Sequence, residues 1–468
     1  MKEKLQRINE YLWLVPKAVR KGMRVNAVIL ANEADMAMIE EEAINQLTNV
    51  AMLPGVVEPV MAMPDAHWGY GLPMGAVGVF DPEQGGIISS GMTGFDINCG
   101  INLIRTNLGA AMVKQKLREL VDEAFKAIPC GVGARSKLKL SIDELKEVLK
   151  QGMKWALSRG YGCAEDLEHT EEHGAMDGAD PSRVSELALK RGRDQLGTLG
   201  SGNHFLEFQE VVEIFDKDTA KEWGLEKGKV CVMVHCGSRG LGHQIATDYL
   251  KIHEKAATRY NIQLPDKQLA CAPINSPEGQ DYFKAMKCAV NYSFTNRLII
   301  THWIREVFER VFGKKWRELG MYTVYGLAHN ICKKETHTIK GEKREVYVHR
   351  KGATRSFPGL PVLIAGSMGT SSWVMKGTEE AMQLTFGSTA HGAGRVLSRK
   401  AAIKKYWGGR VKQEMESAGR IVRAANMKVL AEEAPGAYKD VDAIIETVHQ
   451  ARVSLKVAKL VPLGVIKG

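Results

Sequence analysis

The sequence predicts a single α+β domain that covers residues 1–468, with mixed β-sheets and surrounding helices. Stretches with helical periodicity alternate with short β-rich runs along the whole chain. No glycine/serine-rich or proline-rich linker and no fixed-period repeat divides the chain, although its length alone would allow two or three domains. With 44% hydrophobic residues, a chain of 468 residues can bury a large core.

The individual elements follow from these periodicities. Helical spacing of apolar residues predicts helices at 34–48, 113–126, 142–158 and 277–312. The last of these opens with Ser-Pro-Glu-Gly, which is a plausible helix cap. Runs rich in β-branched residues predict strands at 75–80, 101–105, 230–234, 345–348 and 361–365. The acidic, turn-rich segment 163–181 is expected to be an exposed loop.

The charge balance favours an anionic partner. Lys and Arg number 64 against 54 Asp and Glu, which gives a net charge of +10 and suits nucleic acid, although basic proteins that bind none are common. Two basic stretches could contact a polyanion backbone or could equally be solvated loops. Their candidate residues are Arg191, Arg193, Arg350, Lys351 and Arg355.

Cysteine usage and hydropathy point to the cytoplasm. Eight cysteines without a CxxC pair are too sparse for a disulfide framework, so a reducing compartment fits best. The N-terminus lacks the apolar core of a signal peptide, and no apolar run reaches the ~18 residues of a membrane span. We therefore expect a cytoplasmic protein without a membrane partner.

Five candidate metal ligands lie in glycine-framed or strand-to-loop contexts: Asp96, Cys99, His204, His235 and His329. Each could be an ordinary structural residue if it stood alone, such as a turn-capping Asp, a packed Cys or a hydrogen-bonded core His. Together they offer a mixed N, O and S ligand set, which suits Mn, Fe, Co or Zn better than Mg or Ca. The pair His169 and His173 lacks the HExxH order and is expected to lie in a solvated loop.

His391 has a different setting, in Ser-Thr-Ala-His-Gly-Ala-Gly-Arg. Small residues around a histidine let a phosphate approach closely, and a neutral imidazole can attack phosphorus. A flexible glycine loop with an incidental histidine is the alternative. The segment 365–375 is rich in glycine and hydroxyl side chains and could cradle a phosphate, but it lacks the Gly-Lys-Ser/Thr ending of a P-loop.

Several long motifs together resemble one family. PDAHWGYGLPMGAVGVFD, GFDINCG, LGTLGSGNHFLE, VHCGSRGLGHQIATDYL, VHRKGATRSFPGLPV and AHGAGRVLSR are similar to motifs of the RtcB family of RNA ligases, from about residue 50 to the C-terminus. The resemblance implies a GTP- and Mn²⁺-dependent ligase. Such an enzyme joins RNA ending in a 2′,3′-cyclic phosphate or 3′-phosphate to RNA with a 5′-hydroxyl, as in tRNA splicing and RNA repair.

The resemblance also implies roles for individual residues. Asp96, Cys99 and His204 would bind one manganese ion, and Cys99, His235 and His329 the other. His391 would attack the α-phosphate of GTP to give a covalent GMP–histidine, with Lys467 contacting the guanine. The expected GTP-binding residues are Asn203, His204, Phe205, Leu206, Glu207, His329, Asn330, Ala365, Gly366, Ser367, Met368, Ser372, His391, Gly392, Ala393, Gly394 and Lys467. RNA is the expected partner, with archease as a candidate activator.

Two other classes of protein would use the same residues differently. A two-metal phosphoesterase or nuclease would employ water as the nucleophile and would need neither His391 nor GTP. A non-catalytic RNA-binding protein would hold a structural metal and show no turnover.

Overall fold

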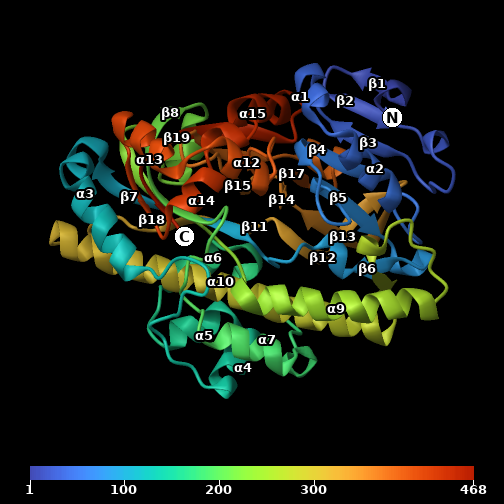
Figure 1. Cartoon of the computed structure of the whole chain (residues 1–468), viewed down its shortest axis with the longest axis horizontal. Helices are drawn as coiled ribbons and strands as arrows, with labels where there is room; N and C mark the ends of the chain where they lie inside the picture. Colours follow the sequence, from blue (N-terminus) through green and yellow to red (C-terminus); the bar gives the residue numbers. More distant parts are fainter.

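The computed structural model describes all residues, 1–468, and has the predicted α+β architecture. Figure 1 shows two large sheets side by side, with the long helices α9 and α10 running along their lower edge. One hydrophobic cluster contains Ile29 of one sheet, Phe308 of α10 and Phe208 of the other sheet. A core that joins both sheets is consistent with the predicted single domain.

The first large sheet has seven strands in the order β1-β2-β3-β4-β5-β13-β12. All neighbouring pairs are antiparallel except β3 and β4, which are parallel. The strands are β1 (Gln6–Asn9), β2 (Leu12–Val15), β3 (Ala27–Leu30), β4 (Val60–His67), β5 (Met74–Phe80), β12 (Asn330–Ile339) and β13 (Glu342–Lys351).

The second large sheet has the order β11-β7-β9-β8-β19-β16-β15, and β18 pairs in parallel with β19. Its strands are β7 (Gly100–Gly109), β8 (Phe205–Ile214), β9 (Lys229–Cys236), β11 (Thr323–Ala328), β15 (Pro361–Ile364), β16 (Ser372–Gly377), β18 (Ile421–Ala424) and β19 (Ser454–Lys467). Two small antiparallel pairs complete the strands: β6 (Ile87–Ser89) with β10 (Cys271–Pro273), and β14 (Ala353–Arg355) with β17 (Ser388–Ala390).

Fifteen α-helices surround these sheets. They are α1 (Glu33–Met38), α2 (Glu41–Val50), α3 (Ala110–Ala127), α4 (Ile142–Gln151), α5 (Met153–Ser158), α6 (Ala164–Glu168), α7 (Glu186–Arg193), α8 (Lys217–Glu222), α9 (Arg239–Arg259), α10 (Pro277–Phe312), α11 (Glu379–Leu384), α12 (Arg399–Lys405), α13 (Gly408–Ser417), α14 (Met427–Glu432) and α15 (Val441–Gln450). The predicted cap of α10 is confirmed, because the Ser276 side chain accepts a hydrogen bond from the backbone N–H of Gly279. None of the helices combines the length and apolar character needed to cross a membrane.

Three predictions about local structure were wrong. The predicted helix 34–48 is two helices, since the backbone at Ile39 and Glu40 is extended between α1 and α2. The predicted helix 142–158 breaks at Gly152, whose φ is +57°. That glycine also packs closely, because a Cβ there would lie 2.4 Å from the carbonyl oxygen of Gly174.

The segment 163–181 was also predicted wrongly, because its acidic residues are not exposed as a group. Asp166 and Glu171 are each 1% exposed. Asp166 receives two hydrogen bonds from the Arg305 guanidinium, at 2.6 and 2.7 Å, and a third from the Thr323 hydroxyl. Local composition could not reveal this, since the basic partners lie more than a hundred residues away along the chain.

Candidate metal centre and nucleotide pocket

Strand register brings four of the predicted metal ligands to one end of the second sheet. Cys99 directly precedes β7, His204 directly precedes β8, and His235 lies near the end of β9. Because these strands are antiparallel neighbours, Ile101 and Phe205 both pair with His235, so the start of β7, the end of β9 and the start of β8 coincide. His329 joins them because β11 ends beside the start of β7.

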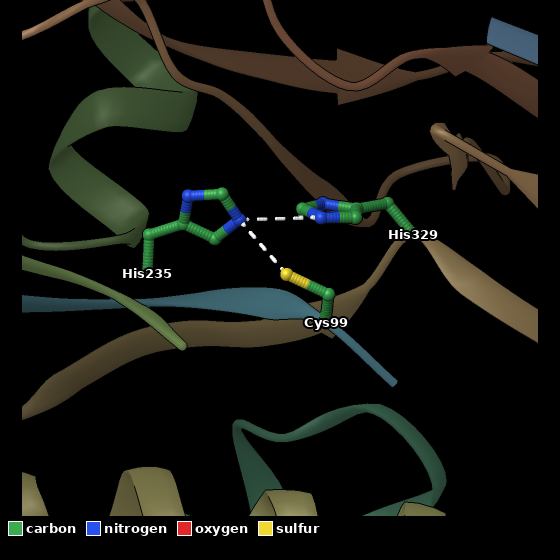
Figure 2. A group of neighbouring side chains, drawn as sticks. All are labelled: Cys99, His235 and His329. Carbon is green, nitrogen blue, oxygen red and sulfur yellow. Dashed lines mark hydrogen bonds between the residues drawn. The ribbon is translucent and has the colours of Figure 1, made fainter. Parts of the chain in front are cut away.

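The ligand atoms form two groups that share Cys99. Figure 2 shows the first: the Sγ of Cys99 lies 3.2 Å from Nε2 of His235, which lies 3.2 Å from Nε2 of His329. In the second group, Nε2 of His204 lies 3.4 Å from the same sulfur and 2.9 Å from Oδ2 of Asp96. Within each group all ligand atoms lie within 4.8 Å of one another. This division matches the two sets that the sequence resemblance implies.

The donor atoms fit a metal ion because their lone pairs face each other. Nδ1 of His204 lies 3.1 Å from the carbonyl oxygen of Leu199, with Nη1 of Arg239 beside it at 3.0 Å. Metal binding through Nε2 places the proton on Nδ1, where the Leu199 carbonyl accepts it, and the Nε2 lone pair then faces the Asp96 carboxylate and the Cys99 sulfur. Acceptors held this closely repel one another unless a proton or a cation lies between them. The mixed N, O and S set suits a transition metal.

Burial keeps the donors in the form that a metal requires. Burial, together with neighbouring positive groups, lowers the pKa of both His235 and His329 well below the usual histidine value, so both rings are neutral. Burial, and then the charge of Asp96, raises the pKa of the Cys99 thiol well above its usual value. A bound cation reverses this effect for the sulfur, because coordination favours the thiolate.

Side-chain hydrogen bonds with α10 fix the turn that carries Cys99. Asn98 adopts a left-handed conformation with φ of +55°, and its side chain donates to the carbonyl of Val290 at 2.8 Å. The buried Arg297 guanidinium donates to the carbonyls of Asn98 and Cys236, both at 2.9 Å. One arginine therefore ties the turn before β7 to the end of β9, and it places a positive charge beneath the Cys99 sulfur.

Asp96 reaches the cluster over a glycine. Its Oδ1 accepts hydrogen bonds from the backbone N–H and hydroxyl of Ser238, at 2.9 and 3.2 Å, which leaves Oδ2 facing His204. A Cβ on Gly237 would lie 2.2 Å from Oδ2 of Asp96, so only glycine permits this approach. Although burial opposes ionisation, the neighbouring His204 and the charge of Arg239 lower the pKa of Asp96 far below its usual value.

Segment 169–172 braces the strand end that carries His329. The Glu171 carboxylate accepts a hydrogen bond from the backbone N–H of Ala328 at 2.8 Å, one residue before this ligand. The same carboxylate pairs with the buried Lys333 ammonium and lies 3.3 Å from Nε of Arg355. The acidic segment therefore positions a metal ligand instead of forming a solvated loop.

His391 lies beside the metal cluster with a ring nitrogen free. Its ring centroid is 4.8 Å from that of His329. Nδ1 of His391 lies 2.7 Å from Oδ2 of Asp65, and the backbone N–H of His391 donates to the same oxygen at 3.2 Å. Because a carboxylate accepts, Nδ1 carries the proton and Nε2 keeps its lone pair, which is the form of imidazole that can act as a nucleophile.

A cavity next to His391 contains most of the predicted nucleotide-binding residues. Those that line it are Asn203, Phe205, Ala365, Gly366, Ser367, Met368, His391, Gly392, Ala393, Gly394 and Lys467. His204, His329, Asn330, Glu207 and Ser372 lie behind this lining, and the Leu206 side chain packs into the hydrophobic core. Alternation along β8 explains that difference, since Phe205 and Leu206 point to opposite faces of the sheet.

The residues behind the lining hold it in place. Gln209 donates to the Glu207 carboxylate at 2.7 Å and to the Ser372 hydroxyl at 3.0 Å. The Asn330 side chain accepts from the backbone N–H of Gly352 at 2.9 Å and donates to the Asp96 carbonyl at 3.2 Å. Asn330 therefore ties the backbone at Gly352 to the backbone of Asp96, whereas Gln209 ties β8 to β16.

Lys467 lines the same cavity in an apolar and acidic setting. Its ammonium is 5.7 Å from the centre of the Phe205 ring and 3.8 Å from Oε2 of Glu433. Burial lowers the pKa of Lys467 from its usual value. Burial also raises the pKa of Glu207 to about 7, although Gln209 and Lys467 oppose that shift. Of the two, Lys467 lines the cavity and can offer its ammonium to a polar ligand.

Comparison with known proteins identifies the family. Residues 46–468 match the family described as tRNA-splicing ligase RtcB. The chain is 51% identical to the tRNA-splicing ligase RtcB of Archaeoglobus fulgidus, across 99% of both chains. It is 50% identical to that of Methanococcus maripaludis across 100% of both chains, and 50% identical to that of Thermococcus kodakarensis across 99% of both. The chain belongs to the RtcB family.

Several residues at the candidate site of this RtcB chain were not predicted from the sequence. Asp65 was missed, although a carboxylate inside the apolar run Val-Met-Ala-Met-Pro-Asp-Ala-His was an available signal. The residues that line the cavity but were not predicted to do so are His67, Met74, His235, Arg395, Arg399, Glu433 and Tyr438. Arg395 donates to the carboxylate of Glu433 at 3.0 Å, and such a pair gives no signal in the local sequence.

Most of the predicted polyanion-binding residues have structural partners in this RtcB chain instead. Arg350 is fully buried and donates twice to the Glu335 carboxylate, at 2.6 and 2.9 Å. Lys351 is 3% exposed, and Arg355 lies against Glu171 and Glu172. These three residues cannot reach an RNA backbone, so the prediction was wrong for them. Arg191 remains exposed, and Arg193 is partly exposed and paired with Asp194.

Proposed function

We propose that this RtcB chain is a GTP- and Mn²⁺-dependent RNA ligase that forms a covalent GMP–His391 intermediate. It joins RNA ending in a 2′,3′-cyclic phosphate or 3′-phosphate to RNA with a 5′-hydroxyl. The substrates are the halves of a cleaved tRNA or other broken RNA, and archease is a candidate activator. The net charge of +10 suits such a polyanionic substrate.

One observation carries the proposal: a histidine with a free Nε2 lies beside a cluster of metal-binding donors. Asp65 holds the proton of His391 on Nδ1, and the ring of His391 is 4.8 Å from that of the donor His329. A hydrolase would need water at this position and would gain nothing from an imidazole nucleophile anchored through its other nitrogen.

The proposed reaction then proceeds through the following steps. Nε2 of His391 attacks the α-phosphorus of GTP, a P–N bond forms, and pyrophosphate leaves. An oxygen of the RNA 3′-phosphate next attacks that phosphorus, which transfers GMP to the RNA and frees His391. A 2′,3′-cyclic phosphate is hydrolysed to the 3′-phosphate beforehand. Finally, the RNA 5′-hydroxyl attacks the 3′-phosphate and expels GMP.

The two donor groups would hold manganese, Asp96, Cys99 and His204 binding one ion and Cys99, His235 and His329 the other. Bound there, divalent ions supply positive charge that offsets the charge of the phosphates. Lys467 would contact the guanine, while Asn203 and the backbone of Gly392–Gly394 would hold the ribose and phosphates. Asp65 accepts the Nδ1 proton of His391, so that in the neutral ring Nε2 carries the lone pair.

The decisive test is covalent labelling. Purified protein with Mn²⁺ and [α-³²P]GTP should acquire an acid-labile label that survives denaturing electrophoresis. His391→Ala should abolish the label, and His449→Ala, which alters a partly exposed histidine on α15, should retain it. Absence of a His391-dependent label would sink the proposal. Phosphate release from RNA without a label would instead support a two-metal phosphoesterase, and RNA binding without turnover would support a structural metal.

A further inference from the structure

Asp65, whose carboxylate orients His391, lies in a part of β4 that has no regular pairing with the neighbouring strands. The strand β3 pairs with β4 at Val60–Ala62 only. The pairing with β5 includes Ala62 and His67, but its register is irregular between these two residues. The β-ladder therefore leaves open the position of the residue that aligns the proposed nucleophile.

A buried lysine holds this part of β4 instead. Lys439 lies just before α15 and is 4% exposed. Its ammonium donates to the backbone carbonyls of Pro64 and Ala66, at 3.1 and 2.8 Å. Because these carbonyls belong to the residues on either side of Asp65, one side chain fixes the backbone before and after the orienting carboxylate.

The backbone of the same lysine holds the loop that carries His391. The N–H of Lys439 donates to the carbonyl of Gly394 at 3.0 Å. This loop also packs directly on β4, since a Cβ on Gly394, whose φ is +65°, would lie 2.3 Å from the carbonyl oxygen of Asp65. Lys439 thus contacts both the strand that supplies the carboxylate and the loop that supplies the imidazole.

The Asp65 carboxylate has few other restraints. It is fully buried, and His391 supplies all of its hydrogen bonds, from the backbone N–H at 3.2 Å and from Nδ1 at 2.7 Å, both to Oδ2. Oδ1 has no hydrogen-bond partner. A Cβ on Gly75 would lie 2.7 Å from Oδ1, so a glycine leaves room for the carboxylate on that side. The position of Oδ2 therefore depends on the backbone that Lys439 holds.

Stability alone does not account for a lysine at this position. Burying an ammonium costs free energy that an apolar side chain would avoid. Burial lowers the pKa of Lys439, although the charges of Asp65 and Asp35 oppose that shift. The ammonium therefore interacts electrostatically with the buried Asp65 carboxylate, in addition to its two hydrogen bonds to the backbone.

We propose that Lys439 is a positioning residue for the transfer of GMP to His391. Its ammonium and its backbone N–H keep Oδ2 of Asp65 aligned with Nδ1 of His391 while the P–N bond forms at Nε2 and pyrophosphate leaves. Lys439 itself neither lines the cavity nor belongs to a donor group. The inference rests on the proposed ligase function and adds to it a residue that acts only through Asp65.

Single-turnover labelling of the full-length, Mn²⁺-loaded protein by [α-³²P]GTP tests this role, because it separates the maximal rate from the half-saturating GTP concentration. Lys439→Met removes the ammonium and keeps a side chain of similar length. Its maximal labelling rate should fall about tenfold, as expected when a reacting group is slightly misplaced. The half-saturating GTP concentration and the Mn²⁺ affinity should stay within about twofold of wild type, since Lys439 contacts neither site.

A double-mutant cycle shows whether Lys439 acts through Asp65. If it does, adding Lys439→Met to Asp65→Ala should leave the labelling rate within about twofold of that of Asp65→Ala alone. A residue that only stabilised the fold would lower the rate by the same factor in both backgrounds. Lys439→Gln, whose amide can donate to one carbonyl, should lose less rate than Lys439→Met, and it completes the cycle if the methionine variant does not fold.

Lys287→Met is the matched control, because the Lys287 ammonium also donates to a backbone carbonyl, that of Asp177 at 2.8 Å, and lies outside the cavity. It should label at the wild-type rate. A wild-type rate in both Lys439 variants would overturn the inference, as would equal losses in both backgrounds or a parallel fall in Mn²⁺ affinity. Failure of wild-type protein to label would instead contradict the ligase function itself.

Discussion

The metal cluster and the nucleotide cavity meet at His391 but are built differently. Four of the five candidate metal donors lie at the ends of adjacent strands, where the β-ladder fixes their relative positions, and the fifth, Asp96, is held by hydrogen bonds from Ser238. The cavity is lined largely by loop residues, such as Gly366 and Gly392, and its charged side chains pair with partners from distant segments. Ladder register therefore sets the geometry of the metal side, whereas individual side-chain contacts set that of the nucleotide side.

This contrast has consequences for mutation. A donor at a strand end can be deleted without moving its neighbours, so the loss should be confined to metal binding. A residue that orients a loop, in contrast, also affects the positions of the other functional groups on that loop.

The shared donor should be the most sensitive position. Cys99→Ala removes the sulfur common to both donor groups. Mn²⁺ affinity and ligation should therefore fall by more than roughly 100-fold, which is the loss seen when a residue that only hydrogen-bonds to a metal ligand is removed. Calorimetric titration with Mn²⁺ and RNA ligation assays measure the two losses. Cys231→Ala, which changes a buried cysteine in the middle of β9, is the control. Normal ligation by Cys99→Ala would refute the shared role.

The orienting carboxylate should affect the nucleophile but not the metal. Asp65→Ala removes the acceptor for Nδ1 of His391, so the rate of His391 guanylylation should fall on the order of 100-fold. Mn²⁺ affinity should stay within about twofold of wild type, since Asp65 belongs to neither donor group. Single-turnover labelling and Mn²⁺ titration provide the two readouts. Equal losses in both would show that the two sides are not separable.

A charge deletion at Lys467, in the cavity wall, should alter nucleotide affinity alone. Lys467→Met keeps much of the apolar stem over Phe205 and removes the ammonium, so the KM for GTP should rise about tenfold. The maximal labelling rate and the Mn²⁺ affinity should not change. Lys459→Met is a suitable comparison, because Lys459 lies on the same strand and pairs with Asp442 outside the cavity. A fall in labelling rate at saturating GTP would place Lys467 in the chemical step.

The smallest expected effect concerns Glu172, in the segment 169–172 that supports the strand end carrying His329. The charges of Lys333 and Arg355 lower the pKa of Glu172 to about 2, although burial opposes them. A carboxylate whose pKa is depressed on folding stabilises the protein above its ordinary pKa near 4.5, and that contribution is lost as the pH falls towards 2. Glu172→Gln should remove about 1–2 kcal/mol at neutral pH and flatten acid unfolding between about pH 4.5 and 2.

Urea unfolding as a function of pH measures this contribution. The exposed neighbour Glu168 supplies the control as Glu168→Gln, which should keep the wild-type pH dependence. If Glu172→Gln unfolds with the same steepness in acid as wild type, the brace does not contribute through charge.

Several features were readable from the sequence because their signals are local. The long helix α10 follows from its periodicity and its Ser-Pro cap, and the strand cores β5, β7, β9 and β15 from runs of β-branched residues. The candidate ligands stood out because histidine, cysteine and aspartate beside glycine at strand ends are unusual for a core. The sequence motifs also indicated the RtcB family, which the comparisons bear out along almost the whole chain.

Other features needed the tertiary structure because their partners are far apart in the chain. Asp65 lies 326 residues from His391, and the buried Asp166 lies 139 residues from Arg305. Charged residues in a short stretch of sequence suggest that the stretch is exposed. That expectation fails when a charged side chain is buried in an ion pair with a residue from a distant part of the chain. The same limit made Arg350 look available to RNA, although Glu335 holds it in the core.

By itself, the sequence determined which chemical groups are present, the α+β class and the family to which the chain belongs. Only the tertiary structure decided which donors share Cys99 and which nitrogen of His391 is free. The physical reason is that residue types and periodicities act over a few positions of the chain. Strand register, burial and hydrogen-bond pairing act over a few ångströms between residues that the chain itself keeps hundreds of positions apart.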